Sequence, residues 1–382
     1  MDLRVSDDDQ HFAETFDKFC RERIGARASQ ADDSGVLPKE NLGDLKEIGF
    51  FELFYPAPYG IREGDDAWLR CAMAEESLAK ACASTFLTAG ATIGLCGAPI
   101  FYFGTEKQKE RWLKPIVSLD KIGCFGLTEP GAGTDAASIK TRAKKSGDKW
   151  ILNGEKALIT NAPIADVAVV MAVTDPDAGY GGVTMFVVDL HKPGVKRTAP
   201  YKKMGLRASP TGGLVFEDVE LTNDDVIGEV GQGFIQAMQT LELGRIGMCH
   251  FGIGIAEAAY DAARKYASER TAFGRPIAKL QAIHFKIADM KIEIDGARLM
   301  ARQCAWRKAK GEHLGALASV AKTYSCEMAV RVADACVQIH GGWGYTTDFP
   351  AERLLRDARL GPIGEGTSEI QRELIARELL DG

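Results

Sequence analysis

The sequence lacks the signals of several protein classes. Its 382 residues include nine cysteines without any CxxC spacing, which favours reduced, buried thiols over a disulfide framework or a zinc site. A net charge of −6 is unsuited to general nucleic-acid binding. The first ten residues, MDLRVSDDDQ, lack the apolar core of a targeting peptide, and no run approaches the roughly 18 apolar residues of a membrane span. We therefore expect a cytoplasmic protein without a nucleic-acid partner or a membrane span.

Common catalytic motifs are also missing. No GxGxxG, P-loop, HExxH or nucleophile elbow occurs in its required context. The six histidines are isolated, and only Cys336 and His340 have helical spacing; without a second pair, a core helix is favoured over a shared metal ion. No metal site is predicted. An enzyme whose cofactor supplies most of the reactive groups remains possible.

The first part of the chain has helical periodicity. At this length two or three packed units are expected, and 46% hydrophobic with 26% charged residues is typical of a globular protein. Phe12, Phe16 and Phe19 share one face of a predicted helix. Residues 72–104, rich in Ala and Gly, predict closely packed buried helices, and Thr105 is a candidate cap for the next helix. We expect an N-terminal α-helical domain over residues 1–120.

The periodicity then changes from helix to strand and back. KWILNGEKALIT (149–160) predicts two short strands around an Asn153-Gly154 hairpin, and further strands follow without helical crossovers. This pattern predicts an antiparallel, sandwich-like or barrel-like β domain over residues 121–230 rather than a Rossmann sheet. Long helical patterns return in residues 231–382 and predict a four-helix bundle. The fold class is therefore α+β, with the β domain between two helical domains.

Four segments carry a specific resemblance. They are FGLTEPGAGTDAASIKT (125–141), ERTAFGRPIAKLQAIHFKIADM (269–290), QIHGGWGYTTDFPAERLLRDARL (338–360) and GPIGEGTSEIQRELIARELL (361–380). Together they resemble the acyl-CoA dehydrogenase family over nearly the whole chain. The resemblance implies an FAD-dependent enzyme, a homotetramer or dimer of dimers, that introduces a double bond between Cα and Cβ of an acyl-CoA thioester. Its implied electron acceptor is an electron-transferring flavoprotein.

The resemblance also implies a set of cofactor-binding residues. Glycines beside Pro130 let backbone N–H groups approach a ligand closely, and the planar fork of Arg270 suits a pyrophosphate. The family often has Trp where this chain has Leu158, so an aromatic wall is missing. The loop at 338–342 resembles one that holds the ADP half of a neighbouring subunit's FAD. The implied FAD contacts are Phe125, Leu127, Thr128, Leu158, Thr160, Arg270, Phe273, Gln281, Gln338, Gly341, Gly342 and Thr367.

Glu365 is the candidate catalytic base. Its local sequence permits two interpretations, a base or an exposed carboxylate near a helix N-terminus, and the three upstream segments favour the base. Some family members place the base at the position of Gly244, which cannot serve here. By resemblance, Glu365 takes the α-proton while flavin N5 accepts the β-hydride, and burial beside an acyl chain would raise its basicity. Glu369 is predicted to be a surface charge of the following helix.

The substrate side of the site is less specific. By resemblance, the substrate contacts are Thr134, Glu242, Arg245, Gly364 and Arg377. Gly364 replaces a common Tyr or Phe, which predicts a wide cavity and a short, branched or alicyclic acyl group. The segment 84–99 contains no arginine, so a substrate with a free carboxylate is disfavoured. Two alternatives stay open: an oxidase, monooxygenase or desulfinase on the same fold, and a non-catalytic flavin-binding scaffold.

Overall fold

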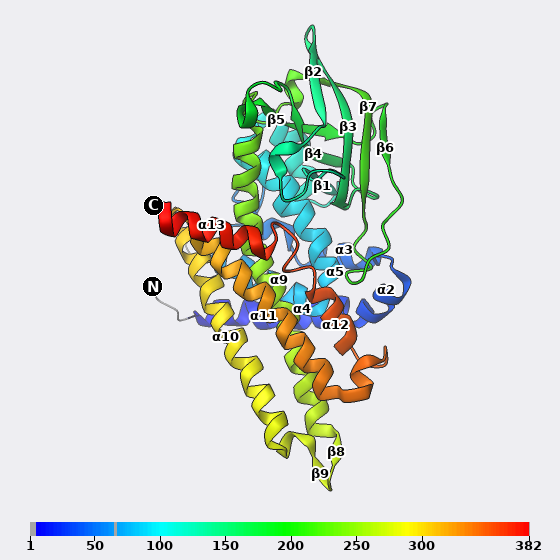
Figure 1. Ribbon diagram of the computed structural model, residues 1–382, viewed down its shortest axis with the longest axis vertical. Helices are drawn as coiled ribbons and strands as arrows, with labels where there is room; N and C mark the ends of the chain where they lie inside the picture. The colour runs from blue at the N-terminus through cyan, green and yellow to red at the C-terminus, as the bar shows by residue number, and fades with distance from the viewer. Residues whose placement is uncertain (1–4, 65–66, 382) are drawn as a thin grey trace.

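The computed structural model describes residues 5–64 and 67–381, and it has the α–β–α arrangement that the sequence predicts. Figure 1 shows the sheet at one end of the molecule and the long C-terminal helices extending from it toward the other end. Helices of the N-terminal part lie at the junction of the two and pack against both.

The N-terminal part is helical throughout. Its helices are α1 (Asp7–Phe19), α2 (Ala28–Ser34), α3 (Lys39–Glu47), α4 (Ala67–Ala81), α5 (Ala83–Gly90), α6 (Ala98–Phe103), α7 (Glu106–Gln108) and α8 (Lys114–Val117). The predicted cap at Thr105 is confirmed, because its side chain accepts from the Gln108 backbone N–H while the Gln108 side chain accepts from the Thr105 backbone. Phe16 lies in the core, as the helical spacing predicts.

One apolar stretch is longer than the sequence analysis allowed for. Residues Ala83–Phe103 form a continuous helical segment that is long and apolar enough to cross a membrane by length and composition. However, 61% of its most apolar window is buried inside the protein. A core helix passes the same test, so the stretch is weak evidence for a span. The burial agrees with the prediction of closely packed helices over residues 72–104.

The middle part is one seven-stranded sheet. Its strands are β1 (Gly123–Gly126), β2 (Arg142–Ser146), β3 (Lys149–Thr160), β4 (Val167–Val173), β5 (Val183–Asp189), β6 (Val195–Arg197) and β7 (Thr211–Thr222). The order is β1-β4-β2-β3-β7-β6, with β5 paired to β4. β4 and β5 are buried along nearly their whole length, because the sheet packs its apolar residues inward and α9 covers it from outside.

Two details of the predicted sheet are wrong. β3 is one continuous strand, so Asn153-Gly154 is not a hairpin turn; Gly154 has φ +141° and lies at an irregularity in the pairing with β7. A side chain at Gly154 would collide with Thr141, which explains the glycine without a turn. The sheet is also not purely antiparallel, since β1 pairs with β4 in parallel over Gly123–Gly126. The chain crosses from β1 to β4 through β2 and β3, which sequence spacing alone does not reveal.

The C-terminal part contains three long helices. α9 (Gly233–Glu269) leads from the sheet to the far end of the molecule, where β8 (Thr271–Ala272) and β9 (Arg275–Pro276) form a small ribbon. α10 (Gln281–Ala309) returns beside it, and α11 (Ala316–His340) runs in the direction of α9 again, so that His340 stacks on Tyr266 of α9. α12 (Ala351–Ala358) and α13 (Ser368–Asp381) complete the chain. α4 of the N-terminal part packs against both α9 and α10, so the helical core is shared between the two parts.

Buried polar and sulfur groups fit this core. All nine cysteines are free and buried, as predicted. Asn161, fully buried with φ +70°, places its Nδ2 2.9 Å from the Thr88 carbonyl and 3.0 Å from the Gly123 carbonyl. This single amide therefore joins the end of β3 to helix α5 and strand β1. Cys336 and His340 are both buried in α11, which confirms a core helix there.

Candidate active site

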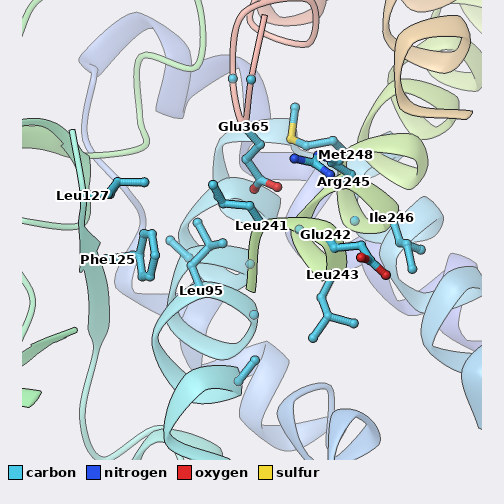
Figure 2. A pocket seen from close by; sticks show the side chains of 18 of the residues that line it. Leu95, Phe125, Leu127, Leu241, Glu242, Leu243, Arg245, Ile246, Met248 and Glu365 are labelled. Carbon is cyan, nitrogen blue, oxygen red and sulfur yellow. The ribbon is translucent and has the colours of Figure 1, made fainter. Parts of the chain in front are cut away.

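A cavity of about 910 Å³ lies where the three parts of the chain meet. Its wall includes strand β1 and the loop after it, the end of β3, parts of α4 and of the helical segment 86–98, the N-terminal half of α9 and the turn before α13. Most of the lining is apolar. Figure 2 shows Phe125 and Leu127 entering from the sheet side and Arg245 and Met248 from α9, with the Glu365 carboxylate between them.

The turn around Glu365 aims its side chain inward. Glu365 has φ +54°, which a residue with a side chain seldom adopts, and Gly366 follows with φ +97°. The carboxylate lies over Gly244 of α9, where a Cβ atom would overlap its Oε2. Among the described residues, none accepts a hydrogen bond from the Glu365 backbone N–H. Both the carboxylate and this N–H are therefore available to a ligand.

Burial dominates the electrostatics of Glu365. It raises the pKa of the carboxylate to about 7, and nearby Glu75 of α4 adds to the rise, while Lys322 of α11 and Arg245 of α9 oppose it. Oε2 is shielded from solvent and has no hydrogen-bond partner among the described residues, and the same holds for the Arg245 Nε. Unpaired buried polar atoms are costly and rare in stable cores. A carboxylate poised near neutral pH in an apolar cavity has the properties of a general base.

A second carboxylate faces the same cavity. Burial raises the pKa of Glu75 to about 7, with His250 opposing and Glu76 adding to the rise. Sequence analysis did not single out Glu75, because two adjacent glutamates on a helix are common on solvated faces. Only the packing of α4 against α9 places this one inside.

The sheet side of the cavity carries the predicted flavin contacts. Phe125, Leu127, Thr128, Leu158 and Thr160 all line it. Leu158 has φ +59° and is 67% exposed, an apolar side chain held outward at the cavity wall. The Thr128 carbonyl accepts from the Ala157 N–H at 2.9 Å, which fixes the loop after β1 against β3.

A buried ion pair supports this loop. Lys156 is fully buried and its Nζ donates to Glu129 Oε1 at 2.7 Å and to the Leu127 carbonyl at 3.1 Å. Glu129 also accepts from the backbone N–H groups of Lys140 and Thr141. Burial lowers the pKa of Lys156 to about 8. Sequence analysis missed the pair, because nothing in the spacing of residues 129 and 156 indicates that they meet.

The substrate candidates divide in three. Thr134, Arg245 and Gly364 line the cavity. Glu242 belongs to the lining as well, but Figure 2 shows its carboxylate pointing away from Glu365. Arg377 lies elsewhere: it is exposed on α13 and pairs with Glu373 at 2.7 Å, one helical turn away. Thr367, predicted to contact the cofactor, lines the cavity beside Glu365.

The remaining predicted cofactor residues lie at the far end of α9. Arg270, Gly341 and Gly342 line a second cavity of about 580 Å³. Phe273 is 90% exposed with φ +54° in the β8–β9 ribbon, and Gln281 and Gln338 are exposed nearby at the ends of α10 and α11. Arg270 makes no ion pair with any residue in 5–64 or 67–381. This cluster is exposed and open, in contrast to the cavity around Glu365.

The two clusters are far apart on one chain. Arg245 beside the first cavity and Arg270 at the second are joined by continuous helix, which at about 1.5 Å per residue separates them by roughly 37 Å. The reacting centre and the cluster at Arg270 are therefore separate sites along α9.

The first cavity fits a flavin ring. Its wall is apolar on the sheet side, and Cβ atoms placed on Gly131 or Gly133 would meet no other atom within 4 Å, so the loop leaves its backbone open to a ligand. The second cavity offers a free guanidinium and two glycines, groups suited to phosphate. The apolar cavity with its buried carboxylate fits the flavin site that the sequence predicts.

Comparison with known proteins gives the family. The models for the N-terminal, middle and C-terminal domains of acyl-CoA dehydrogenase match residues 6–120, 124–219 and 231–380. The chain belongs to the acyl-CoA dehydrogenase family, and it is an FAD-dependent oxidoreductase. A probable acyl-CoA dehydrogenase of Bacillus subtilis is 42% identical over the full length of both chains. A 3-(aryl)acrylate reductase of Clostridium sporogenes is also 42% identical, over 95% of this chain and 96% of that one.

Solved structures agree with this assignment. Butyryl-CoA dehydrogenase from Megasphaera elsdenii superposes with a TM-score of 0.96 at 40% identity, covering all of both chains. A structure described as an electron-transferring flavoprotein of Acidaminococcus fermentans, studied for flavin-based electron bifurcation, matches with a TM-score of 0.97 at 39% identity, again over both full chains. The predicted family, fold class and FAD dependence are therefore confirmed.

Proposed function

We propose that this chain dehydrogenates an acyl-CoA thioester between Cα and Cβ, with Glu365 as the base that takes the α-proton. The observation that carries the proposal is the position of the Glu365 carboxylate, buried over Gly244 with its Oε2 unpaired inside the cavity. Bound FAD supplies the hydride acceptor. The free backbone N–H of Glu365 is available to the thioester carbonyl, and polarising that carbonyl acidifies the α-hydrogens.

The cofactor contacts follow from the two clusters. We propose that Phe125, Leu127, Thr128, Leu158, Thr160 and Thr367 hold the flavin end. Arg270, Phe273, Gln281, Gln338, Gly341 and Gly342 would hold the remainder of an FAD whose flavin end is bound by a second copy. The separation of the clusters along α9 supports this sharing.

An oligomer of the predicted kind has a candidate contact surface. Large apolar side chains recur every seventh residue on the exposed side of α10, at Phe285, Ile292, Leu299 and Trp306. Sevenfold spacing of apolar residues is typical of helix–helix contact, and exposed apolar patches of this kind commonly mark interfaces. We propose a homotetramer built as a dimer of dimers.

The proposed substrate is a short, branched or alicyclic acyl-CoA. A Cβ placed on Gly364 would come no closer than 3.6 Å to Leu360 and 3.8 Å to Met248. The first atom of a side chain would therefore fit beside the base, and the glycine leaves that space to the cavity. Thr134, Glu242, Arg245 and Arg377 remain the proposed contacts for the rest of the substrate. Of the relatives, the butyryl-CoA dehydrogenase is named for a short acyl group, and the 3-(aryl)acrylate reductase adds an aryl group to the candidates.

Further proposals concern the setting of the reaction. An electron-transferring flavoprotein is the proposed electron acceptor, supported by the similarity to the Acidaminococcus structure. We propose a cytoplasmic location and domain limits at residues 1–120, 121–230 and 231–382.

The decisive experiment is anaerobic bleaching of the purified yellow protein by a panel of thioesters: butyryl-, isobutyryl-, cyclohexanoyl-, 3-phenylpropanoyl- and octanoyl-CoA. We expect bleaching by one or more of the first four. Preference for octanoyl-CoA would contradict the substrate proposal while leaving the reaction intact. Rapid oxygen consumption by the reduced protein would favour an oxidase or monooxygenase, and a colourless protein would favour a scaffold without catalysis.

A further inference from the structure

The turn that carries Glu365 is held from two sides by side chains that the family resemblance did not single out. Lys322 of α11 is fully buried, and its Nζ donates to the Gly366 carbonyl at 2.7 Å. Gln371 of α13 is fully buried as well, and its Nε2 donates to the Glu365 carbonyl at 3.2 Å and to the Gly366 carbonyl at 3.3 Å. Three hydrogen bonds therefore converge on two consecutive peptide groups.

These peptide groups need support. Positive φ at Glu365 is disfavoured for a residue with a Cβ atom, and such conformations persist only where surrounding contacts over-determine them. A Cβ on Gly366 would collide with Gln371 Nε2, so the amide packs directly on the turn. Loss of Gln371 would leave the Glu365 carbonyl without a side-chain donor. Loss of Lys322 would leave the Gly366 carbonyl only the longer bond from Gln371, so either loss would free the turn to relax.

Lys322 differs from Gln371 in carrying a charge toward the base. The charged and titratable groups around the Glu365 carboxylate are Lys322 on α11, Arg245 on α9 and Glu75 on α4. The two cations lower the pKa of Glu365 against the effect of burial and of Glu75. Cys326 and Cys249 lie near Lys322, but burial raises their pKa values, so they stay neutral thiols.

We propose that Lys322 and Gln371 are positioning residues that lock the Glu365–Gly366 turn, and that Lys322 in addition supplies positive charge that keeps the carboxylate ionised and ready to accept a proton. This inference rests on the proposed function of Glu365. Holding the turn is an effect of both residues, whereas supplying positive charge is an effect of Lys322 alone.

The test separates proton abstraction from hydride transfer. Acetyl-CoA has α-hydrogens but no β-carbon, so exchange of its α-hydrogens with D2O, followed by mass spectrometry, reports the base alone. The variants are Lys322→Met, Lys322→Arg and Gln371→Met in the FAD-loaded protein. The matched control is Arg331→Met, which removes an exposed cation from the same helix that pairs with Glu293 instead.

We expect the exchange rate at pH 7 to fall about tenfold or more in both Met variants at 322 and 371, because a displaced base loses its geometry. Only Lys322→Met should move the midpoint of the pH–rate profile, upward by about one pH unit, since it alone removes a nearby opposite charge. Lys322→Arg should restore the midpoint. Arg331→Met should change neither quantity.

Several outcomes would overturn the inference. An unchanged or lowered midpoint in Lys322→Met rejects the charge effect, and a normal rate in Gln371→Met rejects the lock. If Lys322→Met does not fold with bound FAD, Lys322→Gln, which keeps a donor without charge, is judged by the same midpoint. A wild-type protein that neither exchanges nor bleaches rejects the proposed function itself, whereas an active wild type with normal variants rejects only this inference.

Discussion

The two cavities along α9 differ in how far one chain encloses them and pairs their polar groups. Beside Glu365, segments from all three parts of one chain enclose a cavity and leave polar atoms buried and unpaired inside it. At the C-terminal end of α9, the Arg270 side chain has no hydrogen-bond or ion-pair partner among the described residues, and Phe273 and Tyr345 are 90% and 88% exposed. Large exposed aromatic side chains that lie close together commonly mark a binding or contact surface. The contrast supports the proposal that a second copy of the chain completes the cofactor site.

The largest effect on turnover is expected in the cavity around Glu365. Glu365→Gln removes the proposed base but keeps its shape, so the variant should bind FAD and lose turnover by roughly 10²–10⁴-fold or more, the range attributed to a positioned general base. Anaerobic bleaching by the preferred acyl-CoA measures this loss, and the flavin absorbance measures occupancy. Glu369→Gln is the matched control, because Glu369 is exposed on α13, and it should bleach normally. Full activity in Glu365→Gln would remove the base from the proposal.

A second prediction tests whether Arg270 binds the FAD of another copy of the chain. Arg270→Met should lose FAD, while Arg264→Met, six residues earlier and exposed, should retain it. Each of Arg270→Met and Glu365→Gln should be inactive alone. Hybrid oligomers that contain both variants should regain a fraction of wild-type turnover, because some sites combine an intact Arg270 with an intact Glu365. Two-tag purification of the hybrid and its bleaching rate provide the measurement; no recovery would mean that one chain holds the whole cofactor.

A third prediction concerns the space beneath the base. Gly244→Ala places a methyl group where the Glu365 carboxylate lies, and the carboxylate is the part able to move. We expect turnover to fall about tenfold to a hundredfold from this misplacement, with little change in thermal unfolding. Gly247→Ala is the control on the same helix, since its Cβ would stay 3.5 Å from the nearest atom, a Glu75 oxygen. Equal loss in both variants would point to a helix effect and not to the base.

The smallest effect is in stability. Burial raises the pKa of Glu365 from 4.5 to about 7, so the folded state holds its proton more tightly than the unfolded state. The stabilisation is therefore complete below pH 4.5 and is lost as the pH rises through 7. At about 1.4 kcal/mol per pH unit, ionised Glu365 costs roughly 3 kcal/mol at pH 8. Glu365→Gln should match the wild type in urea unfolding near pH 5 and exceed it at pH 8; a gain independent of pH would contradict this assignment.

Sequence patterns predicted the parts of the molecule that depend on local spacing. The change from helix to strand to helix, the cap at Thr105 and the buried helices of residues 72–104 all follow from neighbours in the chain. The long pattern KWILNGEKALIT misled, because Asn-Gly is compatible with a turn and with an irregular strand, and only pairing with β7 decides between them. The parallel β1–β4 pair has no local signal at all.

In the candidate site, too, local sequence patterns did not predict the contacts between distant segments. Glu365 and Gly244 stood out through resemblance, but Glu75, Lys322 and Gln371 are ordinary residues in ordinary helices until α4, α11 and α13 bring them together. Lys322 was a usable signal, since it lies in an otherwise apolar helical stretch and has no acidic neighbour within one turn of α11. Long-range contacts create the remainder of the site, and no spacing within one segment encodes them.

The nine buried cysteine thiols can report which regions of the protein open to solvent. Burial raises the pKa of Cys96, Cys326 and Cys336 to about 12, so at neutral pH these thiols scarcely form the thiolate that alkylating reagents attack. A reagent present throughout an experiment therefore marks a cysteine only when its surroundings open. Cys124 reports on the sheet and the others on the helical parts, so peptide mapping of the marks gives the order in which regions of the protein come apart.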